Sequence, residues 1–156
     1  MLTFRTATRA DVPDILAMMA DDDVTRERAA AGGAAIPESV DAALWAAFEA
    51  IDADPRNDLI VAEAPDGSLV GTCQLTFTPS LSRGGAERMT IEAVRVRSDQ
   101  RGHGVGREMM VWCLERARER GCRLAQLTTD KKRTDAHRFY ASLGFVASHE
   151  GMKLHL

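Results

Sequence analysis

The stretch RGHGVG at residues 101–106 places glycine at every second position, directly before an amphipathic segment. A glycine inside a helix costs about 1 kcal/mol relative to alanine, so three glycines where a helix begins need a functional reason. Successive backbone N–H groups without side chains, aimed along a helix axis, form a site for an anion. Arg101 within the stretch and Arg107 after it add positive charge. We therefore predict that this loop binds a phosphate-bearing ligand.

Three loop patterns of this kind are known, and the neighbouring residues separate them. A P-loop needs lysine after its last glycine, where this chain has Arg107. A dinucleotide fingerprint starting at Gly102 would need glycine at that same position. It would also need an acidic residue about 20 residues further on, where Cys122 stands. The third pattern, [RQ]-x-x-G-x-[GA], is matched in full by residues 101–106.

Tyr140 and Glu92 are the side chains best suited to move protons. Tyr140 is the only tyrosine of the chain and lies within HRFYASLGF, residues 137–145. A phenol has a pKa near 10, so it can donate a proton to a group that becomes basic during a reaction. Glu92 precedes Val94 by two residues in a strand-like stretch, so we expect both side chains on one face and Glu92 as a candidate general base. The alternatives are a core aromatic for Tyr140 and a solvated strand position for Glu92.

The surrounding sequence predicts alternating strands and helices that position these residues. Periodicity and turn residues indicate a strand over 2–7, a short helix after Asp11, a helix over 37–53, strands over 58–64, 68–78 and 87–97, a helix to residue 120, a strand over 123–129, a helix over 135–143 and one or two closing strands in FVASHEGMKLHL. This order predicts an α+β fold with a mostly antiparallel sheet. The connection from residue 87 to residue 129 should join parallel strands.

Composition indicates one globular domain. The chain has 156 residues, of which 45% are hydrophobic and 28% are charged. Cys73, Cys113 and Cys122 have no CxxC spacing, so the sequence predicts neither a disulfide framework nor a zinc site, and we expect no metal. The sequence has no apolar run long enough for a membrane span and no signal-peptide pattern, so we expect a cytoplasmic protein without a membrane partner.

Charge is distributed unevenly along the chain. The net charge is −3, but residues 1–78 carry −9 and residues 79–156 carry +6. This pattern favours an anion against the second half and suits a cationic partner at the first, although solvated faces would give the same pattern. Nucleic acid is not an expected partner, because no basic stripe interleaved with aromatic residues is present.

Three segments resemble the GNAT superfamily of N-acetyltransferases. FRTATRADVPDI (4–15) is similar to the family's opening strand and helix, and IEAVRVRSDQRGHGVG (91–106) to its central strand and acetyl-CoA loop. LTTDKKRTDAHRFYASLGF (127–145) is similar to its closing strand and helix. The resemblance implies the GNAT α+β fold over residues 1–156 as a single domain. That fold has a mixed, mostly antiparallel sheet of about six or seven strands with about four helices on its faces.

The resemblance also assigns roles to residues. Tyr140 would protonate the departing thiolate of coenzyme A, and Glu92 would take the proton of the acceptor amine, directly or through water. The main chain of residues 94–96 would pair with the pantetheine arm, and the loop amides would hold the pyrophosphate. The implied cofactor-binding residues are Val94, Arg95, Val96, Arg101, Gly102, His103, Gly104, Val105, Gly106, Arg107 and Arg133.

Some family positions differ here. Arg133 and Asp130 stand where the family often has asparagine, so Arg133 would contact a phosphate or be solvated, and Asp130 would form a turn. His137 is expected to be an exposed helical residue. A side chain at Gly104 or Gly106 would occupy space that the pyrophosphate approaches.

The implied activity is transfer of the acetyl group of acetyl-CoA to a primary amine of a small molecule, by direct attack in a ternary complex. The motif pattern is most similar to that of small-molecule amine acetyltransferases, and a homodimer is compatible with it. We expect the acceptor site to be shaped by residues 20–40 and the loop PSLSRGG at 79–85. Acetylation of protein N-termini or lysines is one alternative. A non-catalytic coenzyme A-binding module is another, and it would need neither Tyr140 nor Glu92.

Overall fold

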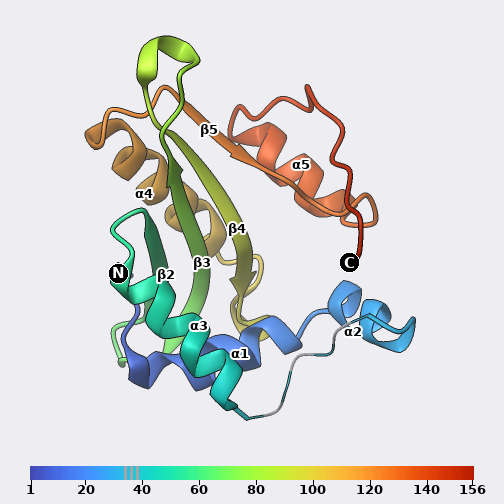
Figure 1. The fold of residues 1–156 in the computed structure, drawn as a ribbon. Coiled ribbons are helices and arrows are strands. Elements are labelled where there is room, and N and C mark those ends of the chain that lie inside the picture. The colour runs from blue at the N-terminus through green and yellow to red at the C-terminus, as the bar shows by residue number, and fades with distance from the viewer. Residues whose placement is uncertain (34, 36, 38) are drawn as a thin grey trace.

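The computed structural model describes residues 1–33, 35, 37 and 39–156, and within them one mixed sheet forms the centre of the molecule (Figure 1). Its strands lie in the order of the sequence: β1 (Thr3–Thr6), β2 (Asn57–Glu63), β3 (Leu69–Thr78), β4 (Arg88–Val96) and β5 (Leu124–Leu127). Each neighbouring pair is antiparallel except β4 and β5, which are parallel. The predicted parallel crossover is therefore confirmed.

Helices cover both faces of this sheet. They are α1 (Val12–Ala20), α2 (Asp23–Ala30), α3 (Ala42–Ala53), α4 (Val105–Glu119) and α5 (Thr134–Ser142). In the described part of the chain there are thus five strands and five α-helices, where we expected about six or seven strands and about four helices. None of these helices is both long and apolar enough to cross a membrane.

Two predicted elements differ from the structure. The helix expected from residue 37 begins at Ala42, because the Asp41 side chain accepts a hydrogen bond of 2.9 Å from the Leu44 amide and so caps the helix there. Residues 34, 36 and 38, which belong to the expected helix or to the expected acceptor segment 20–40, lie outside the described residues. The closing strands expected in FVASHEGMKLHL are absent: residues 145–156, all described, form no strand.

The hydrophobic core lies on both faces of the sheet. Under α4, its buried members include Ile60, Cys73, Leu75, Met89, Ile91, Met109, Met110 and Cys113. The opposite face is covered by α1 and α3, whose buried contacts include Ile15, Met18, Val61, Leu69, Val12, Leu16 and Phe48. Ile60 and Val61, which follow each other in β2, therefore lie on opposite faces of the sheet, because side chains alternate along a strand. This core fixes the positions of β4 and of the helix that follows it.

Helix α2 is held in place by charges instead of apolar contacts. It buries no residue, and the sequence analysis did not predict it. Arg28 lies 2.5 Å from Asp130 and Lys132 lies 3.1 Å from Glu27, so the helix is paired with the segment that follows β5. These pairs bring together residues about a hundred positions apart in the sequence.

Asp22, at the N-cap of α2, makes the most enclosed of these contacts. Its carboxylate accepts two hydrogen bonds from Arg133, of 2.7 and 2.6 Å, and one of 2.9 Å from the Thr25 amide. Burial of the Asp22 carboxylate opposes its ionisation, but the hydrogen bonds from Arg133 and Thr25 outweigh burial and hold its pKa well below its usual range. Asp22 therefore caps α2 and ties it to the segment that precedes α5.

The Asp22–Arg133 pair leads to a test of how α2 is held. Asp22→Asn should cost about 1.5–3 kcal/mol at this contact, which is a factor of about 10 to 100 in the local opening of α2. Hydrogen exchange followed by mass spectrometry measures that opening as the exchange rate of the α2 peptide. Asp23→Asn is the matched control, because the Asp23 side chain is 89% exposed and, among the described residues, forms its ion pair with nearby Arg26.

The same pair predicts a pH dependence. Because the folded pKa of Asp22 lies below its unfolded value of 3.8, its contribution is complete above that pH and is lost as the pH falls below it. The exchange rate of α2 in the unmodified protein should therefore rise on acidification below about pH 4 towards that of Asp22→Asn. Equal α2 exchange rates in the two variants at neutral pH would contradict this account.

Candidate active site

One extra residue in β4 opens the sheet beside β5. Gln74 pairs with Glu92, and Thr72 pairs with Arg95. Between these two pairs, β4 advances by three residues whereas β3 advances by two. Ala93 takes a φ of 51°, which costs a non-glycine residue about 1–2 kcal/mol. β5 pairs with β4 only as far as Ile91, and the two strands diverge beyond that point (Figure 1). Among the described residues, the later part of β4 therefore has no strand neighbour on its β5 side.

This bulge changes which side chains share a face. Ile91, Val94 and Val96 all contact the core under α4, although an uninterrupted strand would not place residues 91 and 94 on one side. Glu92 is exposed and pairs with Gln74 on the opposite, polar face. The prediction that Glu92 and Val94 point to one face is therefore wrong, because the extra residue shifts the alternation by one position.

The free edge of β4 keeps main-chain groups near the predicted pantetheine position. The Val94 carbonyl accepts a hydrogen bond of 2.9 Å from Arg95, and the Val96 carbonyl accepts one of 3.1 Å from Arg101. Each carbonyl oxygen has a second lone pair. These arginines hold the edge in place and leave the main chain able to pair with an extended ligand.

The glycine loop connects β4 to α4, and its glycines have different roles. Gly102 and Gly104 adopt φ values of 78° and 87°, which favour glycine, and a Cβ on either would meet no atom within 4 Å. Gly106 lies inside the first turn of α4, and a Cβ there would lie 3.5 Å from Phe139 and 3.6 Å from Val96. A Cβ on Gly106 would therefore face α5 and β4 at ordinary van der Waals distance. The expectation that a side chain there would meet the pyrophosphate stays a prediction.

The first turn of α4 presents unpaired amide groups. The Glu108 amide donates to the Gly104 carbonyl at 3.0 Å, and this bond begins the helical pattern. The amides of Val105, Gly106 and Arg107 therefore have no acceptor inside the helix. A helix N-terminus stabilises a nearby anion by about 0.3–1 kcal/mol. The position of this turn agrees with the anion site predicted from the glycine pattern.

The charged side chains of the loop lie around that turn. Arg101, His103 and Arg107 are all exposed. Arg101 donates a hydrogen bond of 2.8 Å to the carbonyl of Asp21, and Arg107 donates one of 3.4 Å to the Ser142 hydroxyl. The two arginines thus link the loop to the end of α1 and to α5.

Tyr140 lies on α5 within an aromatic group. Its ring centroid is 5.1 Å from that of Phe139 and 5.8 Å from that of Phe145, both in edge-to-face geometry. Because Phe139 also contacts Gly106, α5 places Tyr140 beside the start of α4. Burial raises the pKa of the Tyr140 phenol above its usual value, although Arg133 and Arg95 act in the opposite direction. The hydroxyl is therefore protonated at neutral pH.

Arg133 and Arg95 form a positively charged group with Asp22. Sequence reasoning gave Arg133 either a phosphate contact or a solvated position, but the structure pairs it with Asp22. Arg95 Nη2 lies 3.7 Å from the same carboxylate, and its Nε is buried without a hydrogen-bond partner among the described residues. Burial lowers the pKa of Arg95. The Asp22-x-x-Thr25 pattern, typical of a helix N-cap, was the signal that would have located this cluster.

His137 and Asp130 lie next to this cluster. His137 is exposed on α5, as expected, and its Nε2 lies 2.9 Å from the Asp130 carbonyl, so it also supports the segment before α5. The Asp130 carboxylate accepts a hydrogen bond of 2.9 Å from the Lys132 amide, which is the turn expected of it.

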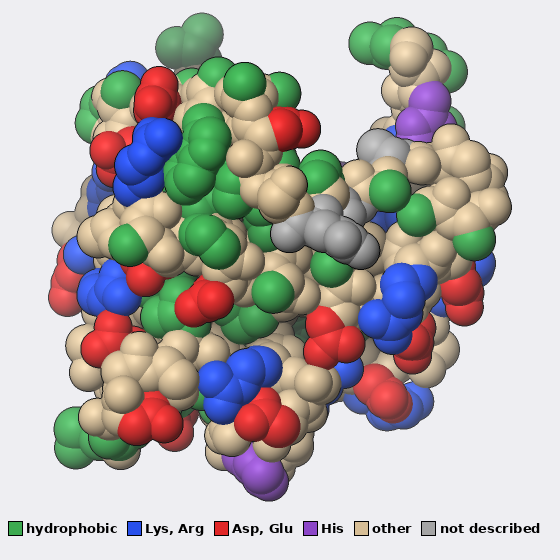
Figure 2. Space-filling model, turned by 90° about the horizontal axis from the view of Figure 1, so that it is seen from below, with side chains coloured by type: hydrophobic (Ala, Val, Ile, Leu, Met, Phe, Trp, Pro, Cys, Tyr) green, Lys and Arg blue, Asp and Glu red, His purple; other side chains and the backbone are tan. Residues whose placement is uncertain are grey.

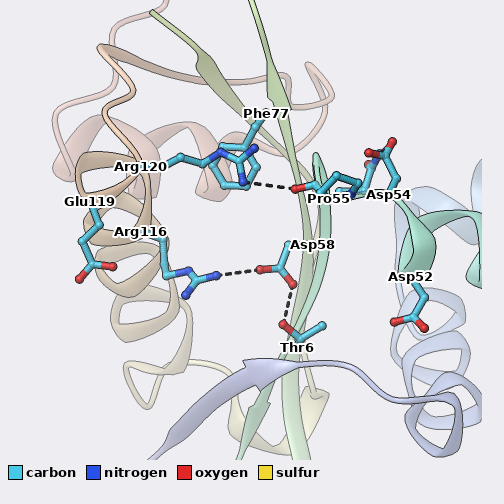
Figure 3. Close-up of a pocket in the computed structure, with 10 residues that line it drawn as sticks. Thr6, Asp52, Asp54, Pro55, Asp58, Phe77, Arg116, Glu119 and Arg120 are labelled. Carbon is cyan, nitrogen blue, oxygen red and sulfur yellow. Dashed lines mark hydrogen bonds and ion pairs between the residues drawn. The ribbon is translucent and has the colours of Figure 1, made fainter.

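A separate hollow lies between α4 and β2, away from these residues (Figure 3). In it, Arg116 donates to Asp58 at 3.2 Å, and Thr6 donates to the same carboxylate at 2.8 Å. Arg120 donates to the Pro55 carbonyl at 3.2 Å. Several of its polar groups are thus bound to one another, and the residues that line it include neither of the predicted catalytic side chains.

The uneven charge of the sequence is partly balanced within the fold. Asp22–Arg133, Asp58–Arg116 and Glu27–Lys132 each pair an acidic residue of the first half with a basic residue of the second. Figure 2 shows acidic and basic side chains interspersed on the face seen from below. Contacts between the halves therefore account for part of the pattern that suggested a cationic partner.

Comparison with known proteins agrees with this geometry. An aminoalkylphosphonate N-acetyltransferase of Salmonella typhimurium (strain LT2) is 41% identical over 59 residues, which are 38% of each chain. A glucosamine 6-phosphate N-acetyltransferase of Trypanosoma brucei brucei is 35% identical over 92 residues, 59% of this chain and 60% of that one. The matches thus span 38% and 60% of these relatives.

A solved structure matches along the whole chain. The protein from Bacillus halodurans C-125, described as a transcriptional regulator, is 46% identical, covers 100% of both chains and superposes with a TM-score of 0.91. The family model described as the acetyltransferase (GNAT) family matches residues 22–145, from the start of α2 to the end of α5. The chain therefore belongs to the GNAT family of acetyltransferases.

Proposed function

We propose that residues 1–156 act as a single-domain N-acetyltransferase that transfers the acetyl group of acetyl-CoA to a primary amine of a small molecule. The observation that carries this proposal is the position of the free edge of β4, which leads directly into the unpaired amides of α4. The free edge of β4 can pair with the extended pantetheine arm of acetyl-CoA, while the first turn of α4 holds the phosphates of the same ligand. Direct attack of the amine in a ternary complex needs no covalent enzyme intermediate.

The residues present fit acetyl-CoA. The main chain of residues 94–96 would pair with the pantetheine arm, and the amides of residues 102–107 would hold the pyrophosphate with added charge from Arg101 and Arg107. The strained backbone of Ala93 supports this assignment. Such strain persists only where the surrounding structure requires it, and this is common at functional sites. When bound, acetyl-CoA supplies the acetyl thioester that the amine attacks.

Tyr140 would act as the proton donor. Its raised pKa keeps the phenol protonated, so the hydroxyl donates a hydrogen bond to negative charge that develops on the leaving sulfur. Coenzyme A thiolate has a pKa near that of cysteine, about 8.5, and a hydrogen bond from the phenol stabilises it as it forms.

Glu92 would accept the proton of the attacking amine, directly or through water. Its carboxylate is exposed on the polar face, where Gln74 and Thr76 both donate hydrogen bonds to Asn57. The bulge separates this face from the face that carries Val94. Glu92 would thus approach the attacking amine from the polar side of the strand, while the thioester would lie along its free edge.

The acceptor that we propose also carries an anionic group. Arg95 and Arg133 share the single carboxylate of Asp22, so this cluster has one positive charge in excess near Tyr140. The buried Arg95 Nε offers a donor without a partner among the described residues. The two curated relatives are named for an aminoalkylphosphonate and for glucosamine 6-phosphate, which are amines that carry such a group.

A panel of paired amines tests both parts of this proposal. Glucosamine 6-phosphate should exceed glucosamine, and 2-aminoethylphosphonate should exceed ethylamine, by about 10- to 100-fold in kcat/KM, the effect of a charge-assisted hydrogen bond. Release of free thiol from acetyl-CoA measures the rate. An equal or higher kcat/KM for the uncharged amine would rule out recognition of an anionic group on the acceptor. It would leave the proposed acetylation of an amine in place. No thiol release with any amine would contradict the proposed transfer.

Tyr140→Phe tests the proton donor, because it removes the hydroxyl and keeps the ring in its aromatic contacts. We expect unchanged folding and acetyl-CoA binding and a fall in kcat of about 10- to 1000-fold. The loss should be smaller for acyl donors whose thiol has a lower pKa, since their thiolates need less stabilisation. The assay compares kcat for both proteins under conditions where chemistry limits turnover.

Phe139→Leu is the matched control for packing around Tyr140. It disturbs the neighbouring ring but keeps the phenol, so its kcat should fall less than that of Tyr140→Phe while its stability falls more. An unchanged kcat in Tyr140→Phe would rule out the acid role and leave water as the proton source.

A further inference from the structure

Two buried side-chain atoms of the described residues have no hydrogen-bond partner there, and both lie where β4 and β5 have diverged. They are Arg95 Nε, on β4 beyond the bulge, and Thr129 Oγ1, two residues after the end of β5. Arg95 belongs to the charged group with Asp22 that the proposed function already uses. The Thr129 hydroxyl has no part in that group and needs an explanation of its own.

The residues next to Thr129 use their hydrogen bonds among themselves. The carbonyl of Asp130 accepts a hydrogen bond of 2.9 Å from the Arg133 amide and lies 2.9 Å from His137 Nε2. A hydroxyl can donate one hydrogen bond and accept two, and leaving this capacity unused in a buried position is unfavourable. The described chain thus holds a buried hydroxyl ready for a partner that it does not itself supply.

The register of the sheet shows how far along β4 this hydroxyl lies. Ile91 and Leu127 form the last parallel pair of β4 and β5. Ala93 and Thr129 each lie two residues beyond that pair, so Thr129 is level with the bulge. This is the point at which the free edge of β4 begins.

Thr129 also lies on the side of the sheet that carries the proposed proton donor. Ala125 and Leu127 contact the core under α4, and alternation along the chain places Thr129 on the same side. Val94 and Tyr140 contact that core as well. A ligand along the free edge of β4 would therefore meet Thr129 and Tyr140 from the same side of the sheet.

We infer that the Thr129 hydroxyl forms a hydrogen bond with the amide of the pantetheine arm that is nearest to the thioester. The inference rests on the proposed function, which places the arm along residues 94–96 and its phosphates at the start of α4. Because the glycine loop follows β4, the phosphate end of the arm would lie beyond Val96 and the thioester end toward Ala93. Thr129 is level with the thioester end.

This hydrogen bond would position the reacting group. In acetyl-CoA, two carbon atoms join the nitrogen of that amide to the sulfur, so an amide held by Thr129 limits where the thioester can lie relative to Tyr140. β4 would hold the arm through its main chain on one side, and the end of β5 would hold it through a side chain on the other. Thr129 is thus a binding residue that the sequence analysis did not assign.

Thr129→Val tests the hydrogen bond, because valine keeps the shape of threonine and replaces its hydroxyl with a methyl group. Titration calorimetry should show a dissociation constant for coenzyme A at least about fivefold higher than that of the unmodified protein, since an amide of the arm loses its partner. Adenosine 3′,5′-bisphosphate, the nucleotide end of coenzyme A without the arm, should bind both proteins equally. Thr129→Ser keeps the hydroxyl and should restore most of the affinity for coenzyme A.

The stability of the ligand-free protein separates ligand binding from a structural role. Thr129→Val removes a buried hydroxyl that has no partner among the described residues, so the midpoint of thermal unfolding should stay unchanged or rise. Thr72→Val is the matched control, because the buried Thr72 hydroxyl donates a hydrogen bond of 2.8 Å to the Ile60 carbonyl. Loss of that bond should lower the midpoint.

Two results would overturn the inference and leave the proposed transfer in place. One is an equal dissociation constant for coenzyme A in Thr129→Val and the unmodified protein, because a buried water would then be the partner of the hydroxyl. The other is a fall in the unfolding midpoint of Thr129→Val as large as that of Thr72→Val, because the hydroxyl would then stabilise the fold. An unmodified protein that binds neither coenzyme A nor the bisphosphate would overturn the proposed function and this inference with it.

Discussion

Between the Gln74–Glu92 pair and the Thr72–Arg95 pair, β4 has one more residue than β3. Ala93 takes a left-handed backbone conformation that accommodates this extra residue. Pairing with β5 ends just before this point, so the same insertion leaves a main-chain edge free and turns Glu92 and Val94 to opposite faces. The strand then runs into the glycine loop, which sets the direction of α4. The ligand edge, the proposed base and the anion site thus all depend on one local departure from regular strand geometry.

The proposed site is completed by elements that are far apart in the sequence. α5 contributes Tyr140 and lies beside the start of α4, where Phe139 faces Gly106. α2 has no buried apolar face. The ion pair between Asp22 and Arg133 holds it against the segment that precedes α5. In the proposed site, packing therefore holds the residues assigned to acetyl-CoA, while ion pairs hold the residues assigned to the anionic group of the acceptor.

Strong periodic patterns predicted most of the fold, and the glycine loop predicted that unpaired amides would lie where α4 begins. The bulge was missed although IEAVRVR carries a trace of it: Ala93 and Val94 are adjacent apolar residues, so the alternation of apolar and polar residues shifts by one position there. α2 was missed because its residues are mostly polar and give no apolar stripe. The closing strand was expected from the alternation in MKLHL, which is present, but a strand also needs a neighbour to pair with. That Gly106 faces Phe139 could not be predicted from the sequence, because this contact joins two helices that are far apart along the chain.

Amide hydrogen exchange with and without coenzyme A tests the central claim most directly, since it reports on the backbone of β4 and of the loop at once. If the free edge and the helix turn hold the ligand, saturating coenzyme A should slow exchange at residues 94–96 and 105–107 by at least about tenfold. Exchange in β2, which lies on the far side of β3, should change little. Protection that appears elsewhere, with these two segments unchanged, would contradict the account.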